Sequence, residues 1–170
     1  MKLDVILTPA YAREGDLEGC LCAVVDVLRA TSTITVALVN GAAAVYPCLS
    51  AAEARRRVEK LSRSSYLLGG EEMGLRIPGF DLGNSPVEYA APGAVKGRSV
   101  FFYTSNGTPA IRRAYTESGS SIYIASLLNM SAVAAALARD ASRCPRGGRR
   151  CPARASSSAG TAAFSATRLR

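Results

Sequence analysis

The chain has 170 residues and a mass of 17.8 kDa, which is enough for one domain with its own hydrophobic core. It contains no histidine, and this excludes a Ser-His-Asp or Cys-His catalytic arrangement and any metal site built on histidine. Its formal net charge of +8 suggests nucleic acid or an anionic membrane as a binding partner.

The positive charge is unevenly distributed along the chain. Residues 1–140 carry 14 basic and 13 acidic side chains, whereas residues 141–170 carry seven arginines and no acid. The second stretch is rich in Arg, Pro, Ala and Ser, and it has too little apolar surface to offset the entropy of ordering. We therefore expect a folded domain over 1–140, followed by a disordered or aberrant tail over 141–170. Because the domain is almost neutral, we do not expect nucleic acid as a partner.

The sequence also bears on location. No apolar run reaches the length needed to cross a bilayer, and the first residues carry no pattern of a secretory signal. Five cysteines without a CxxC motif favour reduced thiols. We expect a cytoplasmic protein without a membrane partner.

Strand and helix patterns alternate along the first half of the chain. Short alternating or continuous apolar runs indicate strands, and a capping box or an Asn-Gly pair marks where helices begin or end. The expected strands are Leu3–Leu7, Cys20–Val27 and Ala43–Cys48, and the expected helices run from Ser32 to Asn40 and from Ser50 to about Leu61.

The same alternation continues in the second half. It predicts strands at Tyr66–Gly70, Ser99–Thr104 and Ser121–Ala125, a capping box at Ser85–Glu88, a helix to Tyr115 and an Ala-rich helix to Asp140. Alternating strands and helices are typical of α/β proteins. We expect a layered α/β/α fold with a mostly parallel, mixed sheet.

Three strands each lead into a polar turn that opens a helix. The turns read DVLRATST, TSNGTP and SLLNMS. The carboxyl ends of parallel strands form the ligand crevice of such folds, and helix N-termini attract phosphate or carboxylate. The candidate substrate-binding residues in these turns are Thr31, Ser32, Thr104, Asn106, Thr108, Asn129 and Ser131. Alternatively these side chains only cap helices, but capping does not explain Asp26 and Arg29.

The stretch from Glu71 to Ser85 has no hydrophobic period and is rich in Gly, Pro and polar residues. Glu71, Asp81 and Asn84 supply the hard oxygen atoms that Mg²⁺ prefers, although spacing alone does not fix a metal site. Asp81 could instead only stabilise a turn.

Four stretches resemble one known family in order and approximate spacing. They are VVDVLRATSTITVALVNGA (24–42), LLGGEEMGLRIPGFDLGNSPVEY (67–89), TSNGTPAI (104–111) and LLNMSAVA (127–134). The chain resembles the 2-phosphosulfolactate phosphatases of coenzyme M biosynthesis, the ComB-like family. The resemblance implies an α/β fold and a Mg²⁺-dependent phosphatase that converts 2-phospho-3-sulfolactate to 3-sulfolactate and phosphate. Family members are longer, so we expect a truncation or frameshift after about residue 140.

Chemical reasoning then assigns roles to the residues. We expect Asp26, Arg29 and Asp81 to be catalytic, and Asp26, Glu71 and Asp81 to hold Mg²⁺. Arg29 would bind phosphate or sulfonate oxygens, and Asp26 or Asp81 would orient water or act as nucleophile. Asn84 joins the substrate-binding residues. Alternatively, Asp26 is a structural acid associated with the helix, or Arg29 pairs with Asp26 in a structural ion pair.

The expected partner is a small anionic phosphate ester, and assembly into a homo-oligomer is left open. A second function is also left open, because the family's C-terminal part is expected to be missing. The chain would then be a phosphate- or sulfonate-binding domain without turnover.

Overall fold

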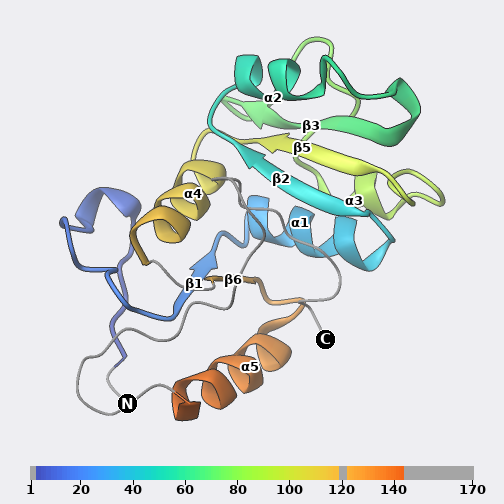
Figure 1. Cartoon of the computed structure of the whole chain (residues 1–170). Coiled ribbons are helices and arrows are strands. Elements are labelled where there is room, and N and C mark those ends of the chain that lie inside the picture. Colours follow the sequence, from blue (N-terminus) through green and yellow to red (C-terminus); the bar gives the residue numbers. More distant parts are fainter. Residues whose placement is uncertain (1–2, 119–121, 144–170) are drawn as a thin grey trace.

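The computed structural model describes residues 3–118 and 122–143, in which strands and helices alternate as expected for an α/β protein (Figure 1). The strands are β1 (Cys22–Val25), β2 (Ala44–Cys48), β3 (Tyr66–Glu72), β4 (Leu75–Arg76), β5 (Ser99–Tyr103) and β6 (Ile122–Ala125). The helices are α1 (Ala30–Val39), α2 (Ala51–Val58), α3 (Pro86–Ala90), α4 (Gly107–Ser118) and α5 (Met130–Arg143), with short 3₁₀ turns at Pro9–Tyr11 and Arg63–Ser65.

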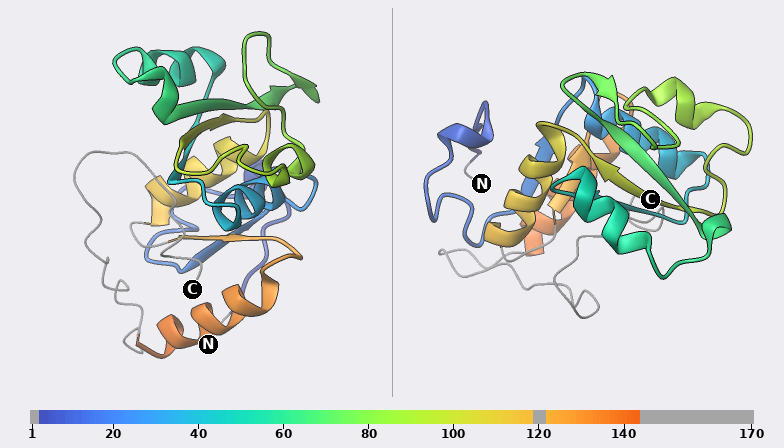
Figure 2. Two further views of the ribbon diagram at one scale, coloured as in Figure 1. Left: turned by 90° about the vertical axis from the view of Figure 1, so that its right-hand side faces the viewer. Right: turned by 90° about the horizontal axis from the view of Figure 1, so that it is seen from above.

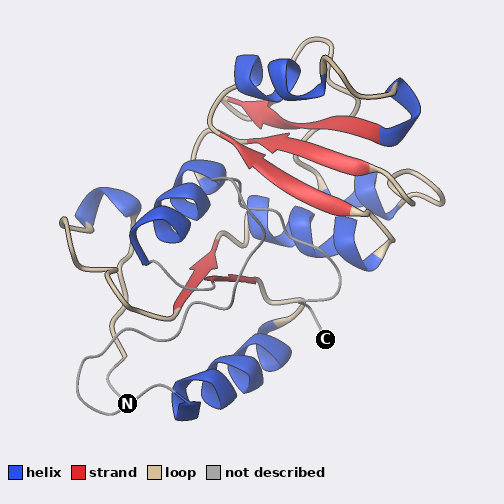
Figure 3. Ribbon diagram, viewed as in Figure 1, coloured by secondary structure: helices blue, strands red, loops and turns tan. Residues whose placement is uncertain are grey.

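The described strands form two sheets rather than one. β1 and β6 make a parallel pair, and the other sheet has the order β2-β5-β3-β4, in which only β4 is antiparallel (Figure 3). Helices α1 and α4 lie between the sheets and contact strands of both, whereas α2 covers the far side of the larger sheet and α5 the far side of β6 (Figure 2). The expected layered arrangement is therefore confirmed, with helices inside as well as outside.

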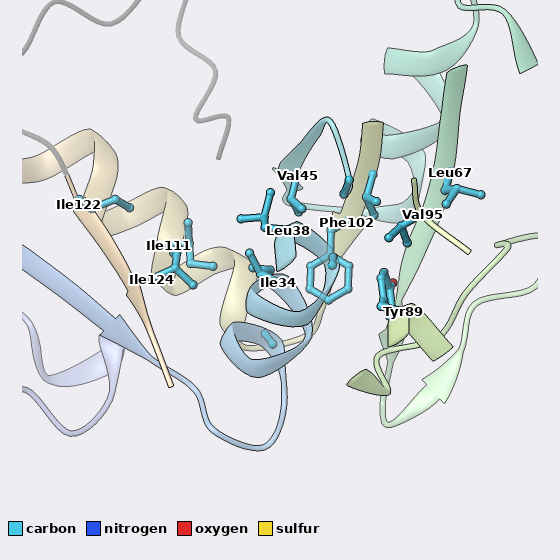
Figure 4. Packing of buried hydrophobic residues seen from close by; sticks show 14 of the residues in the cluster. Ile34, Leu38, Val45, Leu67, Tyr89, Val95, Phe102, Ile111, Ile122 and Ile124 are labelled. Carbon is cyan, nitrogen blue, oxygen red and sulfur yellow. The ribbon is translucent and has the colours of Figure 1, made fainter. Parts of the chain in front are cut away.

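The main core fills the space around α1. Ile34 and Leu38 of α1 pack with side chains from both sheets and from α4, among them Phe102, Ile111 and Ile124 (Figure 4). Full burial of such a side chain contributes about 1.5–3 kcal/mol. This core fixes α1 and α4 against the two sheets, and the starts of these two helices carry two of the three polar turns.

Two glycines allow β3 to lie close to its neighbours. A Cβ atom at Gly69 would lie 2.1 Å from the Tyr89 hydroxyl oxygen, which donates to the Gly83 carbonyl at 2.8 Å. Gly70 has a φ of +133°, and a Cβ there would lie 1.8 Å from the carbonyl oxygen of Tyr103. The glycine pair thus sets the position of the next residue, Glu71.

Some sequence expectations differ from the structure. Leu3–Leu7 forms no strand, because no described strand lies beside it to complete its hydrogen bonds, and its apolar side chains are exposed. Ser50 caps α2 as predicted, with its hydroxyl accepting from Glu53 N at 3.0 Å. Ser85 makes no such bond at α3.

The proposed tail over 141–170 lies largely outside the described residues, and the boundary near Asp140 stays a prediction. Within the described part of the chain, no helix is both long enough and apolar enough to cross a membrane.

Candidate active site

The three polar turns meet at one edge of the structure. β1 and β6 are parallel neighbours with Val25 opposite Ala125, so the turns that follow them begin side by side. The turn after β5 lies against the first of these, since a Cβ atom at Gly107 would lie 2.6 Å from Asp26 Oδ2 and 2.3 Å from Ala30 Cβ. The Asp26 carboxylate is therefore held between the starts of α1 and α4.

Asp26 has an unusual electrostatic environment. Partial burial raises the pKa of its carboxyl group, and the nearby Glu71 carboxylate raises it further. A hydrogen bond from the Ala30 backbone N–H and the Arg29 guanidinium oppose this rise in pKa. A partly buried acid next to a second carboxylate and a cation is typical of functional sites.

Glu71 joins two loops beside Asp26 and is only 8% exposed. Its Oε1 accepts from Ser105 N at 2.8 Å, and its Oε2 accepts from Gly74 N at 2.6 Å and from Ser105 Oγ at 3.4 Å. Met73 N in turn donates to Ser105 Oγ at 3.1 Å. Glu71 thus fastens the β3–β4 turn to the turn after β5.

Arg29 occupies the N-cap position of α1 and is partly buried. Its side chain makes no hydrogen bond or ion pair with another residue in the described ranges, so the alternative of an Asp26–Arg29 ion pair finds no contact to support it. An unpaired guanidinium at a helix start is available for an anion.

Buried threonines brace two of the turns. Thr31 Oγ1 donates to the Asp26 carbonyl at 2.8 Å and accepts from Asp26 N at 2.9 Å. Thr108 Oγ1 donates to the Thr104 carbonyl and accepts from Thr104 N, both at 3.0 Å. The Thr104 hydroxyl accepts from Thr108 N at 3.1 Å. This geometry favours bracing of the turns over direct contact with a substrate.

The remaining predicted turn residues fall into two groups. Ser32 donates to the Val27 carbonyl at 2.8 Å, and Asn129 bonds Ser126 N at 2.8 Å and the Ile124 carbonyl at 3.0 Å. Asn106 and Ser131 are exposed, and their side chains make no hydrogen bond within the described chain. The side chains of Asn106 and Ser131 are therefore available to contact a ligand.

Asp81 does not join Asp26 and Glu71. It accepts from Leu68 N at 2.8 Å and pairs with Arg63. Leu68 precedes Glu71 by three residues of β3, roughly 10 Å along a strand. Asp81 therefore fixes its loop to β3. This agrees with the alternative stated above, in which Asp81 stabilises a turn and holds no metal.

Asn84 lies beside the end of β3, because Leu82 pairs with Gly69 in parallel. The side chain of Asn84 is 7% exposed, and its buried Oδ1 has no hydrogen-bond partner in the described chain. Buried amide oxygens usually have a partner, so this one is available for a cation or a hydrogen-bond donor.

The predicted set of three carboxylate ligands is not assembled, and no group of three or more Cys, Asp or Glu residues within 3–118 and 122–143 could hold a metal. Mg²⁺ nevertheless usually takes one or two protein carboxylates and keeps several waters. Asp26, Glu71 and the orphaned oxygen of Asn84 supply donors of that kind.

Sequence reasoning missed Ser105 and Gly107. Ser105 positions Glu71 through its N–H and its hydroxyl, and Gly107 leaves room for Asp26. Glycine is used where a backbone approaches a neighbour closely, but it is also common at helix starts, so the sequence alone did not single out Gly107.

Comparison with known proteins identifies a family that the chain matches over most of its length. A family model for 2-phosphosulpholactate phosphatase matches residues 6–143. A probable 2-phosphosulfolactate phosphatase of Symbiobacterium thermophilum is 50% identical over 124 residues, covering 73% of this chain and 52% of the relative. Proteins of the same description from Clostridium acetobutylicum and Clostridium perfringens are 42% and 43% identical, covering 79% of this chain and 55% and 54% of the relatives. The chain thus spans about half the length of the curated relatives it matches.

Proposed function

The chain belongs to the 2-phosphosulfolactate phosphatase family, and we propose that it hydrolyses 2-phospho-3-sulfolactate to 3-sulfolactate and phosphate. One observation carries this proposal. The Asp26 carboxylate lies between the starts of α1 and α4, with Glu71 beside it and the unpaired Arg29 next to it. This combination provides both a group that can act on a phosphate ester and groups that can bind its charge.

Anion binding falls to Arg29 and the helix starts. The guanidinium would bind phosphate or sulfonate oxygens in a bidentate manner. The N–H groups of Asn106 and Gly107 have no hydrogen-bond partner among the described residues, and they lie where α4 begins. Together they place positive charge around the ester and stabilise the charge that develops during its cleavage.

The reaction requires a group that positions the attacking oxygen. Asp26 would either orient a water molecule that attacks phosphorus, or itself attack phosphorus, in which case the ester P–O bond breaks, 3-sulfolactate leaves and water then hydrolyses the aspartyl phosphate. Its carboxylate lies against Gly107 at the start of α4, while the Thr31 brace holds its backbone. A carboxylate held in this way needs little reorganisation when the substrate binds.

The donor set fits Mg²⁺, which Asp26 and Glu71 would hold with the Asn84 amide oxygen. When bound, Mg²⁺ supplies charge neutralisation at the phosphoryl oxygens. We also propose a role in coenzyme M biosynthesis and a cytoplasmic location. The reduced thiols of Cys22 and Cys48 fit a reducing compartment.

The test is release of phosphate from 2-phospho-3-sulfolactate with and without Mg²⁺. We expect activity that exhaustive chelation abolishes, and at least a ~10²-fold lower rate in Asp26→Asn, as is typical when a catalytic group is removed. Asp16→Asn is the matched control, because Asp16 accepts from Arg13 N in a surface turn. Near-normal turnover by Asp26→Asn would remove Asp26 from the mechanism.

A second candidate is binding of phosphate or sulfonate without turnover. The half-length match to the relatives favours it, because the whole catalytic apparatus of the family need not lie in this half. Calorimetric binding of 3-sulfolactate or phosphate, weakened by Arg29→Met, combined with no phosphate release at any Mg²⁺ concentration, would establish this function instead.

A further inference from the structure

Arg76 lies on the same side of the larger sheet as the candidate site. In the β3–β4 hairpin Arg76 is directly opposite Glu71, and residues paired in this way project from one face of a sheet. The Arg76 side chain extends toward α3, since its Nη1 lies 3.9 Å from Glu88 Oε2 and 3.4 Å from the Asp81 carbonyl oxygen. Helix α3 packs against α1, the helix that begins beside Asp26. Arg76 therefore borders the site from the β4 edge of the sheet.

Most N–H groups of the Arg76 guanidinium have no acceptor within the described chain. Its contacts there are the long ion pair with Glu88 and the bond to the Asp81 carbonyl, whereas a guanidinium has five N–H groups. The Arg76 side chain is 59% exposed, so the ion pair contributes little to stability. Arg76 thus joins Arg29 as a cation at the site with donors available for an anion.

Glu88 holds Arg76 beside the loop that carries Asn84. The Oε2 atom of Glu88 also accepts from Gly83 N at 2.8 Å. A Cβ atom at Gly83 would lie 2.8 Å from Glu88 Oε1 and 3.6 Å from Arg76 Cβ. The next residue is Asn84, whose buried Oδ1 has no partner in the described chain. The Arg76 side chain therefore lies next to a residue of the candidate site.

Arg76 and the start of α4 lie on opposite sides of Glu71. On one side Glu71 accepts from Ser105 N after β5, and on the other it pairs with Arg76 of β4. Neighbouring strands are about 5 Å apart, so two strand spacings separate the end of β5 from Arg76. A ligand bound at Asp26 and the start of α4 would therefore meet Arg76 through a group remote from the one on which Asp26 acts.

We infer that Arg76 binds the sulfonate of the substrate, and this inference rests on the function proposed above. 2-Phospho-3-sulfolactate carries a phosphate, a carboxylate and a sulfonate. The phosphate lies at Asp26, where Arg29 and the start of α4 neutralise its charge. The sulfonate sulfur is one bond further from phosphorus than the carboxylate carbon is, so the sulfonate reaches further toward β4. A guanidinium can bind two oxygens of such a group, which makes Arg76 a specificity-determining residue.

Kinetics with three phosphate esters test this assignment. The substrate is compared with 2-phospholactate, which lacks the sulfonate, and with 2-phosphooxypropane-1-sulfonate, which lacks the carboxylate. We expect Arg76→Met to lower kcat/KM at least about tenfold for the two esters that carry a sulfonate, and to change it less than about twofold for 2-phospholactate. Arg76→Lys should recover part of the loss, because it restores the charge but not the planar pair of donors.

Arg56→Met is the control for these kinetics, because Arg56 is exposed on α2, which covers the opposite face of the larger sheet. It should leave kcat/KM unchanged for all three esters. An equal loss with all three esters in Arg76→Met, or a loss confined to the two that carry a carboxylate, would overturn the inference.

Product binding separates this inference from the proposed reaction. If the wild-type chain releases no phosphate from any ester, the proposed reaction fails, but calorimetry with 3-sulfolactate still reports on Arg76. The wild-type chain should bind 3-sulfolactate at least about tenfold more tightly than Arg76→Met does, while both bind inorganic phosphate equally. Equal affinity of the two chains for 3-sulfolactate, or no binding by the wild-type chain, would overturn the role of Arg76.

Discussion

The Asp26 carboxylate leaves no room for a side chain at Gly107. A Cβ atom there would lie 2.6 Å from Asp26 Oδ2 and 3.2 Å from Thr104 Oγ1. Either the carboxylate or the start of α4 must shift to admit a methyl group. Since the carboxylate and the start of α4 both belong to the candidate site, a side chain at position 107 would disturb the proposed catalytic geometry.

Gly107→Ala is therefore expected to lower phosphate release by at least about tenfold and stability by about 1–3 kcal/mol, because overpacking displaces its neighbours. Gly93→Ala is the control, because a Cβ atom at Gly93 meets no atom within 4 Å. Its positive φ costs roughly 1 kcal/mol but leaves the site unchanged. Steady-state kinetics and urea unfolding separate the two effects. Wild-type activity in Gly107→Ala would contradict the arrangement.

Cys48 predicts a loss of stability at alkaline pH. Burial raises the pKa of its thiol from 9.0 to about 11, with Arg57 partly opposing the rise. Below pH 9 the thiol is protonated in both states, so it contributes no pH dependence. Between pH 9 and 11 the unfolded chain ionises its thiol first, so the free energy of unfolding falls by up to about 2–3 kcal/mol. Urea unfolding from pH 8 to 11 should show a shallower decline in Cys48→Ala. Parallel declines would disprove the assignment.

Single residues also show what sequence could predict about the site. Asp26 and Arg29 follow directly from the strand-to-helix turn that contains them, and the structure places both at the junction of the turns. Asp81 could not be placed, because its position depends on Arg63 and on the backbone of Leu68, which are distant in sequence. Spacing identifies a carboxylate as a candidate ligand, but it does not show which hydrogen-bond donor or cation contacts that carboxylate in the folded structure.

At the scale of elements, side-chain braces hold each turn in shape. The Thr108 hydroxyl satisfies the buried N–H of Thr104, where β5 has already ended. Thr108→Val keeps the shape but leaves that N–H without a partner, so we expect a loss of about 1–3 kcal/mol. Thr108→Ser retains the hydroxyl and should lose only about 1 kcal/mol for the missing methyl group. Equal losses in urea unfolding would show that packing, and not the brace, matters.

Element types were predictable wherever a local pattern determined them. The apolar runs that became β1, β2, β3, β5 and β6 all lie within or overlap the expected strands. Leu3–Leu7 has the same kind of pattern but forms no strand, because a strand also needs an edge to pair with. The division into two sheets was not predictable for the same reason, since pairing between distant strands leaves no local signature.

At the scale of the whole molecule, Arg113 connects the N-terminal segment to the folded body. Its guanidinium donates to the carbonyl oxygens of Pro9 at 2.5 Å and Ala12 at 2.9 Å. It also pairs with Glu117 at 2.7 Å, one turn along α4. The contacts with Pro9 and Ala12 join residues about a hundred positions apart in sequence, so loop-closure entropy opposes them. The segment before β1 otherwise buries few side chains.

Arg113→Met should therefore free the N-terminal segment while leaving the main core around α1 intact. We expect faster limited proteolysis between Thr8 and Gly19, because cleavage follows local opening. Global unfolding should change by less than about 1 kcal/mol, since partly exposed ion pairs contribute little. Arg112→Met is the matched control, because the neighbouring arginine pairs with Glu53 on α2 instead. If both variants are cleaved at the wild-type rate, other contacts hold the segment, and the link between the N-terminus and α4 has no mechanical role.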